Sequence, residues 1–203
     1  GMPVLVDAGT GRYGGDQAWR DHFRSTSVHN TLCINGQSSS RATGPFLWSQ
    51  SQRAQASVVE PAAHNGDGLT AEHDGYRAEF GVVHKRRLRL QRDGVLIEDS
   101  LDGRLPPGAQ VEISFLVNPQ MTVAETAQGW IVLHEGRALL EILAPAERAR
   151  RTDLGRLDPK RGWVSESYGT RASAPRLVSH GAWPVIGNAQ TILRTPRAEV
   201  GAK

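Results

Sequence analysis

Residues 24–37 are RSTSVHNTLCINGQ, and together with residues 3–13, PVLVDAGTGRY, they decide how the rest of the chain is interpreted. Each stretch contains a short apolar run with the alternation of a β-strand, and each run begins or ends at polar side chains. These side chains are Asp7, Arg12, Tyr13, His29 and Asn30. Strand ends and the loops beside them are where proteins usually place binding and catalytic groups. The five residues are therefore the candidate site residues.

The strand pattern continues through most of the chain. Short runs with period-two alternation are separated by Gly, Pro, Asn and Asp, and the clearest hairpin joins residues 82–91 to 95–101 around an Arg-Asp-Gly turn. Residues 17–24 instead have a helical pattern behind the N-cap Asp16, with Trp19 and Phe23 on one face. The sequence predicts an all-β, antiparallel β-sandwich, supersandwich-like, with one short helix near the N-terminus.

Two further segments carry explicit expectations. Residues 144–162 are rich in charge and are predicted to form a long loop, and the HDGY sequence at 73–76 is predicted to lie between two short strands. Further strands are expected at about residues 29–35, 53–59, 110–117, 130–134, 137–143, 175–180 and 190–194. At 203 residues, the chain is expected to be one domain, 1–203.

The composition favours an anionic partner. The formal net charge is +3 and the pI is about 9.4, and arginine greatly outnumbers lysine. Arginine suits carboxylates and sulfates because its planar fork donates two parallel hydrogen bonds. No basic helix, zinc finger or RNP-like aromatic strand supports nucleic-acid binding, and no apolar run is long enough to span a membrane. The single cysteine, Cys33, lies in an alternating apolar run and is interpreted as a buried small side chain.

The quoted motifs resemble those of a known family. VLVDAGTGRY, a Trp-Arg pair and FRSTSVHNTLCINGQ resemble the start of the C-terminal β-sheet domain of heparinase II/III-like polysaccharide lyases, a group that includes oligoalginate lyases. The resemblance continues through HDGY, residues 82–101 and VSESYG at 164–169. In that family a helical domain and then a His-x-His motif precede the VDAGT strand. Neither is present here, so we expect this chain to be truncated from a larger, periplasmic or secreted parent.

Asp7 and His29 are the candidate metal ligands. A lone histidine in a strand is usually structural, but a carboxylate at a neighbouring strand end changes the balance, because Zn²⁺ accepts imidazole and carboxylate together. The resemblance implies that the family's zinc ligands include the residues matching Asp7 and His29, with a third from the absent His-x-His motif. Zinc is therefore a possible cofactor with an incomplete site, and the two residues are expected to converge from adjacent strands. His22, His73 and His84 lack ligand-like spacing and are interpreted as structural or surface residues.

Arg12 and Tyr13 are the candidate catalytic residues. Cleavage beside a uronic acid requires removal of the C5 proton, which becomes acidic when the neighbouring carboxylate is neutralised. Arg12 can neutralise that carboxylate and Tyr13 can transfer the proton; the resemblance implies an active-site arginine at Arg12 in the alginate-lyase branch. An exposed Arg-Tyr turn explains the pair equally well. Asn30 is a candidate substrate-binding residue, although ordering the turn before its strand is the simpler role.

The leading prediction of function is the C-terminal part of a polysaccharide lyase that cleaves an acidic, uronic-acid-containing polysaccharide, such as a glycosaminoglycan or alginate, by β-elimination. The isolated chain is expected to be inactive without the helical domain. The alternative is a non-catalytic carbohydrate-binding or structural β-sandwich module. The basic residues 148–151, 156, 160 and 161 either clamp a polyanion or form a solvated loop.

Overall fold

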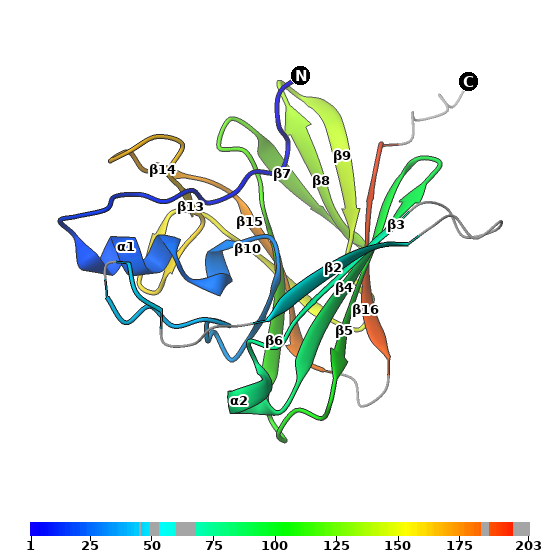
Figure 1. The fold of residues 1–203 in the computed structure, drawn as a ribbon. Coiled ribbons are helices and arrows are strands. Elements are labelled where there is room, and N and C mark those ends of the chain that lie inside the picture. The colour runs from blue at the N-terminus through cyan, green and yellow to red at the C-terminus, as the bar shows by residue number, and fades with distance from the viewer. Residues whose placement is uncertain (45, 49–52, 60–67, 184–186, 197–203) are drawn as a thin grey trace, which may run out of the picture.

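The computed structural model of the protein describes residues 1–44, 46–48, 53–59, 68–183 and 187–196. Within these ranges most elements are antiparallel strands, and helix is confined to α1 (Gln17–Phe23), the 3-10 turn η1 (Thr26–Val28) and α2 (Arg77–Phe80) (Figure 1). The all-β, sandwich-like prediction is confirmed. No helix in the described part of the chain is long and apolar enough to cross a membrane.

The larger sheet has eight antiparallel strands in the order β2-β3-β4-β5-β16-β9-β8-β7. The strands are β2 (Ala54–Val59), β3 (Gly68–His73), β4 (Val83–Gln91), β5 (Gly94–Asp102), β7 (Thr122–Thr126), β8 (Gly129–His134), β9 (Arg137–Leu143) and β16 (Asn188–Arg194). The predicted β4–β5 hairpin is confirmed, with Gln91 paired to Gly94 across the turn. The last strand, β16, is inserted between β5 and β9 and so joins two halves of the sheet.

The smaller sheet has the order β1-β6-β15-β10. Its strands are β1 (Leu32–Ile34), β6 (Gln110–Leu116), β10 (Ala149–Asp153) and β15 (Arg176–Ala182). Two short ribbons follow β10, formed by β11 (Arg156–Leu157) with β12 (Lys160–Arg161) and β13 (Trp163–Val164) with β14 (Ala172–Ser173).

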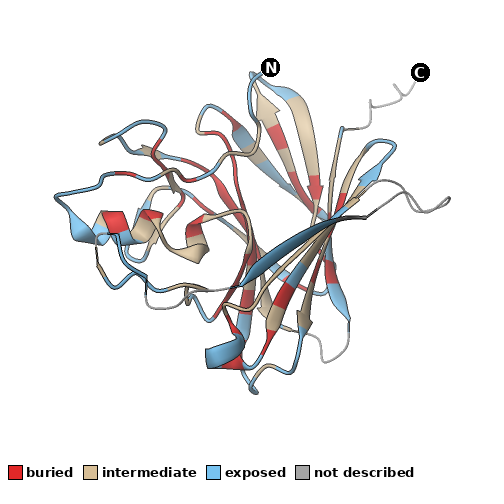
Figure 2. Ribbon diagram, viewed as in Figure 1, coloured by how far each residue is buried: buried red, intermediate tan, exposed pale blue. Residues whose placement is uncertain are grey.

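The main core lies between the two sheets. Alternate side chains of β6, namely Val111, Ile113 and Phe115, are at most 5% exposed and pack in one cluster with Tyr76 and Ile97. Figure 2 shows the buried residues of both sheets along the region where they face each other. These three residues face the same core because every second residue of β6 from Val111 to Phe115 is apolar, and alternate side chains of a strand point to the same face.

A third layer covers the other face of the smaller sheet. Leu116 points away from the main core and packs with Ala8, Phe23, Val28 and Val164. Figure 1 shows α1 on the far side of β6 and β15 from the eight-stranded sheet. Asp16 caps α1 by accepting from the Trp19 N–H, and the rings of Trp19 and Phe23 stack at 5.8 Å, as the helical pattern predicts. This layer carries all five candidate site residues.

Charged side chains fill the space between the smaller sheet and part of this layer. Glu112 is bonded by Arg151 and Arg176 at 2.6 and 3.0 Å, and Asp153 is bonded by Arg176 at 3.1 Å. Burial opposes ionisation of Glu112, but the arginine bonds outweigh it and lower its pKa to about 2. Arg161 also bonds to Glu112. Much of the basic cluster is therefore paired inside the fold.

Two expectations about these elements are wrong, and the strand β7 was missed. Residues 144–162 contain β10, β11 and β12 instead of one long loop, because the side chains that point inward there are charged and paired, which hides the strand pattern. HDGY is followed by α2 rather than a second strand, since the Arg77 N–H bonds to the Asp74 carbonyl and starts a helical turn. The mostly exposed strand β7 was not predicted at all.

Candidate functional site

Asp7 and His29 lie in contact although they are far apart in the sequence. Asp7 Oδ1 is 2.7 Å from His29 Nδ1, and the Gly9 N–H donates to Asp7 Oδ2 at 2.9 Å. The prediction that the two residues converge is confirmed. The prediction of adjacent strands is wrong, because Asp7 follows a segment whose isolated bridge joins Leu5 to Val117, just after β6, and His29 is the C-cap of η1. Partial burial opposes ionisation of Asp7, but His29 and the backbone N–H groups of Gly9 and Ala8 together outweigh it and lower the pKa of Asp7.

Asn30 fixes the two chain segments that carry this pair. Its Nδ2 donates to the Val6 carbonyl at 3.0 Å, and its Oδ1 accepts from the Leu116 N–H at 2.7 Å. The Ser114 hydroxyl bonds to the His29 carbonyl at 3.1 Å. Asn30 thus joins the segment before Asp7 to the end of β6. This arrangement supports the ordering role considered for Asn30, since both ends of its amide are engaged with the backbone.

A buried polar network lies behind Asn30. Arg86 donates from Nη1 to the Asn30 carbonyl at 2.5 Å and forms a two-bond ion pair with Asp99. His84 bonds to the same carboxylate at 2.7 Å, and His73 bonds to His84 at 3.1 Å. Burial of Asp99 opposes its ionisation, but His84 and Arg86 outweigh it and hold its pKa below the ordinary value. Burial and the neighbouring His84 lower the pKa of His73 to about 4. The structural interpretation of His73 and His84 fits this network.

The donor chemistry at Asp7 and His29 suits zinc in part. One carboxylate and one imidazole meet at a point that is still open, with side chains 64% and 36% exposed. Tetrahedral zinc ligands with bonds of roughly 2.0–2.2 Å stand about 3.4 Å apart, so the pair must open slightly to hold the ion. No group of three His, Cys, Asp or Glu side chains suited to a metal occurs among the described residues.

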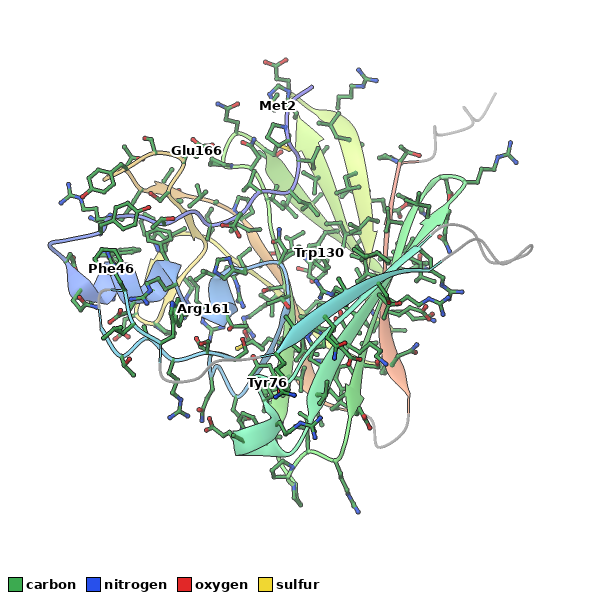
Figure 3. All side chains as sticks on the ribbon, in the orientation of Figure 1. Met2, Phe46, Tyr76, Trp130, Arg161 and Glu166 are labelled. Carbon is green, nitrogen blue, oxygen red and sulfur yellow. The ribbon has the colours of Figure 1, made fainter. Side chains whose placement is uncertain are left out.

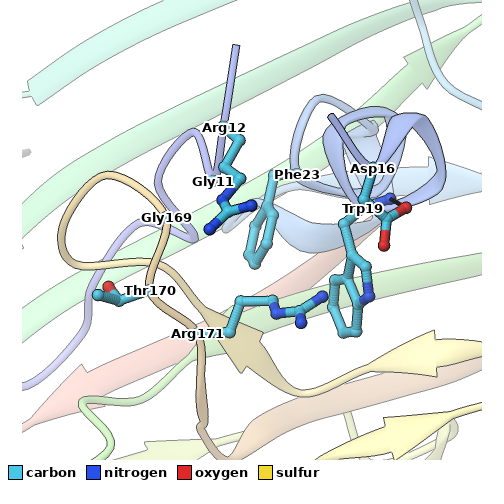
Figure 4. A pocket seen from close by; sticks show the side chains of 8 residues that line it. All are labelled: Gly11, Arg12, Asp16, Trp19, Phe23, Gly169, Thr170 and Arg171. Carbon is cyan, nitrogen blue, oxygen red and sulfur yellow. Dashed lines mark hydrogen bonds between the residues drawn. The ribbon is translucent and has the colours of Figure 1, made fainter. Parts of the chain in front are cut away.

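Arg12 lines a small pocket on the outer layer. The cavity is about 130 Å³ and is bordered by the residues labelled in Figure 4, which are Gly11, Arg12, Asp16, Trp19, Phe23, Gly169, Thr170 and Arg171. A Cβ on Gly169 would lie only 3.2 Å from Arg12 Nε, so the absence of a side chain there leaves room for the guanidinium. Arg171 lies over the Trp19 ring at 4.2 Å. Neither arginine pairs with a carboxylate in the described part of the chain.

Tyr13 lies beside this pocket and not in its lining. Its side chain is 56% exposed, with the rings of Phe46 and Tyr168 at 6.2 and 5.9 Å. Arg12 and Tyr13 therefore face neighbouring surfaces: one guanidinium in a pocket and one phenol among exposed rings. Arg171 was not predicted as a site residue. Its only sequence signal was its position just after the VSESYG motif at 164–169.

These features define a β-sandwich domain that presents polar and cationic site residues from the loops covering one sheet. A family model described as heparinase II/III-like, C-terminal, matches residues 1–190, and the chain belongs to this family. The resemblance to heparinase II/III-like proteins is thereby confirmed. The relation to oligoalginate lyases stays a prediction.

Solved structures of lyases share the fold. A heparinase III with methylated lysines is similar with a TM-score of 0.73 and 17% identity over 98% of this chain and 28% of that one. Heparan sulfate lyase HepC from Pedobacter heparinus is similar with a TM-score of 0.69 and 18% identity over 98% of this chain and 29% of that one. The chain thus spans less than a third of these proteins. No curated protein sequence matches it.

Proposed function

We propose that this chain is the C-terminal β-sandwich part of a polysaccharide lyase that cleaves an acidic polysaccharide next to a uronic acid by β-elimination. The observation that carries the proposal is the pocket in which Arg12 and Arg171 have no carboxylate partner among the described residues, in a chain of the heparinase II/III-like family. Two unpaired guanidiniums at one pocket are suited to an anionic sugar.

The elimination assigns a task to each residue. The C5–H bond breaks and its electron pair forms the C4–C5 double bond, while the C4–O bond breaks and the leaving oxygen takes up a proton. Arg12 binds the uronate carboxylate and stabilises the negative charge that develops on it as C5 loses its proton. Tyr13, which is exposed beside Arg12, donates the proton that the leaving oxygen takes up, and the C5 proton passes to a base supplied by the helical domain. Asn30 holds the segments of Asp7 and His29 together rather than contacting the sugar.

The helical domain expected in a longer parent supplies the other wall of the substrate groove and further catalytic groups. We expect the isolated chain to release no unsaturated uronate from heparan sulfate or alginate, because catalysis needs all of its groups held in one geometry. The parent protein with its helical domain releases them. The measurement is the ultraviolet absorbance of the unsaturated product. Turnover by the isolated chain would show that the second domain is not required, and a parent inactive on every uronic-acid polysaccharide would contradict the proposed function.

Zinc is proposed as a ligand of the parent, held by Asp7 and His29 together with a donor from the preceding segment. When bound, the ion supplies a fixed positive charge that keeps these two side chains in place. Removing a residue that only hydrogen-bonds to a metal ligand typically lowers metal affinity by roughly 10- to 100-fold. We expect His29→Ala to lower the zinc affinity of the parent by more than this, because His29 is proposed to bind the ion directly. The isolated chain binds zinc weakly with or without His29.

Equilibrium dialysis followed by metal analysis of the parent measures this effect. His134→Ala is the control, because His134 lies in the eight-stranded sheet at the end of β8, whereas Asp7 and His29 lie in the layer over the smaller sheet. Equal zinc content in the parent and its His29→Ala variant would remove Asp7 and His29 as ligands.

Non-catalytic glycan binding is the second candidate. It is favoured by the exposed rings beside Arg12, since apolar faces at a loop surface commonly mark a binding site.

A further inference from the structure

Three exposed aromatic rings lie together on the outer layer, and we call Tyr13, Phe46 and Tyr168 the aromatic platform. Their side chains are 56%, 73% and 68% exposed. Tyr13 is central, with ring centroids 6.2 Å from Phe46 and 5.9 Å from Tyr168 and interplanar angles of 31° and 30°. Figure 3 places Phe46 beside α1, far from Tyr76 and Trp130 in the core between the sheets. Apolar rings that lie together at the surface in this way commonly mark a binding site.

A buried arginine supports the platform from below. Arg20 is 5% exposed, and its guanidinium carbon lies 5.6 Å from the centroid of Tyr13 and 5.1 Å from that of Phe46. It also donates to the Arg12 carbonyl at 3.1 Å. Because this cation contacts the rings from the interior, their outer sides stay open to solvent. The platform is therefore held in place before any ligand arrives, which lowers the entropy cost of binding.

The platform borders the pocket that contains Arg12 and Arg171. Arg12 is next to Tyr13 in the chain, and Gly169, which lines the pocket, follows Tyr168. The Gly169 N–H bonds to the Gly11 carbonyl at 3.0 Å and ties the two loops together. A surface of exposed rings is thus continuous with two guanidiniums that lack carboxylate partners in the described ranges.

We propose that the aromatic platform binds pyranose rings of an acidic glycan, with a carboxylate or sulfate of the adjoining sugar held by Arg12 and Arg171. The inference rests on the proposed function and extends it by a sugar-binding surface outside the reacting position. Sugar rings have apolar C–H faces that pack on aromatic rings, and their anionic groups match the arginine fork. The charge of the adjoining pocket favours this occupant over an apolar protein segment, which would leave the two cations unpaired.

The test is an NMR titration of the isolated chain with a heparan sulfate hexasaccharide, an alginate hexasaccharide and neutral maltohexaose. We expect an acidic hexasaccharide to shift signals around the platform, and Tyr168→Ala and Phe46→Ala each to weaken its binding about five- to tenfold. Tyr168→Phe retains binding, because the ring face makes the contact. Leu90→Ala is the matched control, since this side chain is 61% exposed on β4 of the eight-stranded sheet. Circular dichroism confirms that each variant is folded.

The outcomes separate the platform from the proposed function. If an acidic hexasaccharide binds but both alanine variants keep wild-type affinity while Arg12→Ala weakens it, the platform is overturned and the proposed function stands. If no hexasaccharide shifts any NMR signal of the isolated chain, the platform is also overturned. The proposed function is then tested by the lyase activity of the parent. If the alanine variants bind the acidic hexasaccharide as the wild type does but lower the activity of the parent, the rings form an interface with the helical domain instead of a glycan surface.

Discussion

Asp99→Ala is expected to destabilise the chain by about 3–5 kcal/mol, the range found when one partner of a buried ion pair is removed. The Asp99 side chain is fully buried and accepts hydrogen bonds from both Arg86 and His84. Its loss leaves a largely buried guanidinium without a counter-ion and His84, which is 3% exposed, without its acceptor. Because a domain of this kind is stabilised by only about 5–15 kcal/mol in total, the variant is close to unfolding at 25 °C.

The measurement is urea unfolding followed by circular dichroism at neutral pH. Asp102→Ala is the matched control on the same strand, because its side chain is exposed, and we expect a change of less than about 0.5 kcal/mol. Asp99→Asn keeps the shape and one acceptor oxygen of the side chain. Its loss of unfolding free energy is therefore expected to lie between those of Asp99→Ala and Asp102→Ala. An Asp99→Ala variant within about 1 kcal/mol of wild type would mean that the network does not hold the fold together.

The sequence was sufficient for the features that depend on apolar alternation. The β4–β5 hairpin, the burial of Val111, Ile113 and Phe115, and the capped helix α1 all follow from local patterns. The contact between Asp7 and His29 was also predicted, but from the family resemblance together with the two strand-end positions. Alternation alone does not identify which strand ends become neighbours.

The polar interior was not predictable in the same way. Asp99 and Asp153 are buried, and Glu112 is only 15% exposed, because arginines from other strands reach them. No local pattern identifies such partners, which are 13 or more residues apart in the sequence. The strand β10 was missed for this reason. The pocket at Arg12 combines a loop near the N-terminus with one around Arg171, so its second guanidinium could be recognised only after the two loops were placed side by side.

The candidate site is tied to the buried network of the eight-stranded sheet. The Asp99 and Arg86 pair contacts the Asn30 carbonyl, and the Asn30 side chain in turn joins Val6 to Leu116. The position of Asp7 against His29 therefore depends on residues of the large sheet as well as on the loops. Changes at the site are best made at exposed residues that are free of this network.

Arg12→Ala is such a change, and, on the proposed function, it is expected to lower the kcat of the parent by about 10²- to 10³-fold, the range for removing one group that stabilises developing charge. Arg12 lies beside Gly169 in the pocket and is exposed, so its replacement leaves the buried networks intact. Because the bond to the carboxylate strengthens as C5 loses its proton, kcat falls more than substrate affinity. Arg12→Lys restores part of the rate, since lysine supplies the charge without the two-bond geometry.

The assay is the initial rate of unsaturated uronate formation by the parent, measured with saturating and with dilute polysaccharide. Arg92→Ala is the control: Arg92 is an exposed arginine in the β4–β5 turn, and its loss changes the net charge by the same amount. If only the net charge mattered, Arg12→Ala and Arg92→Ala would lower the cleavage rate equally. If Arg12 takes part in the elimination, only Arg12→Ala lowers the rate. If Arg12→Ala cleaves within about twofold of the wild type, Arg12 does not neutralise the uronate carboxylate, and the role passes to a residue of the helical domain.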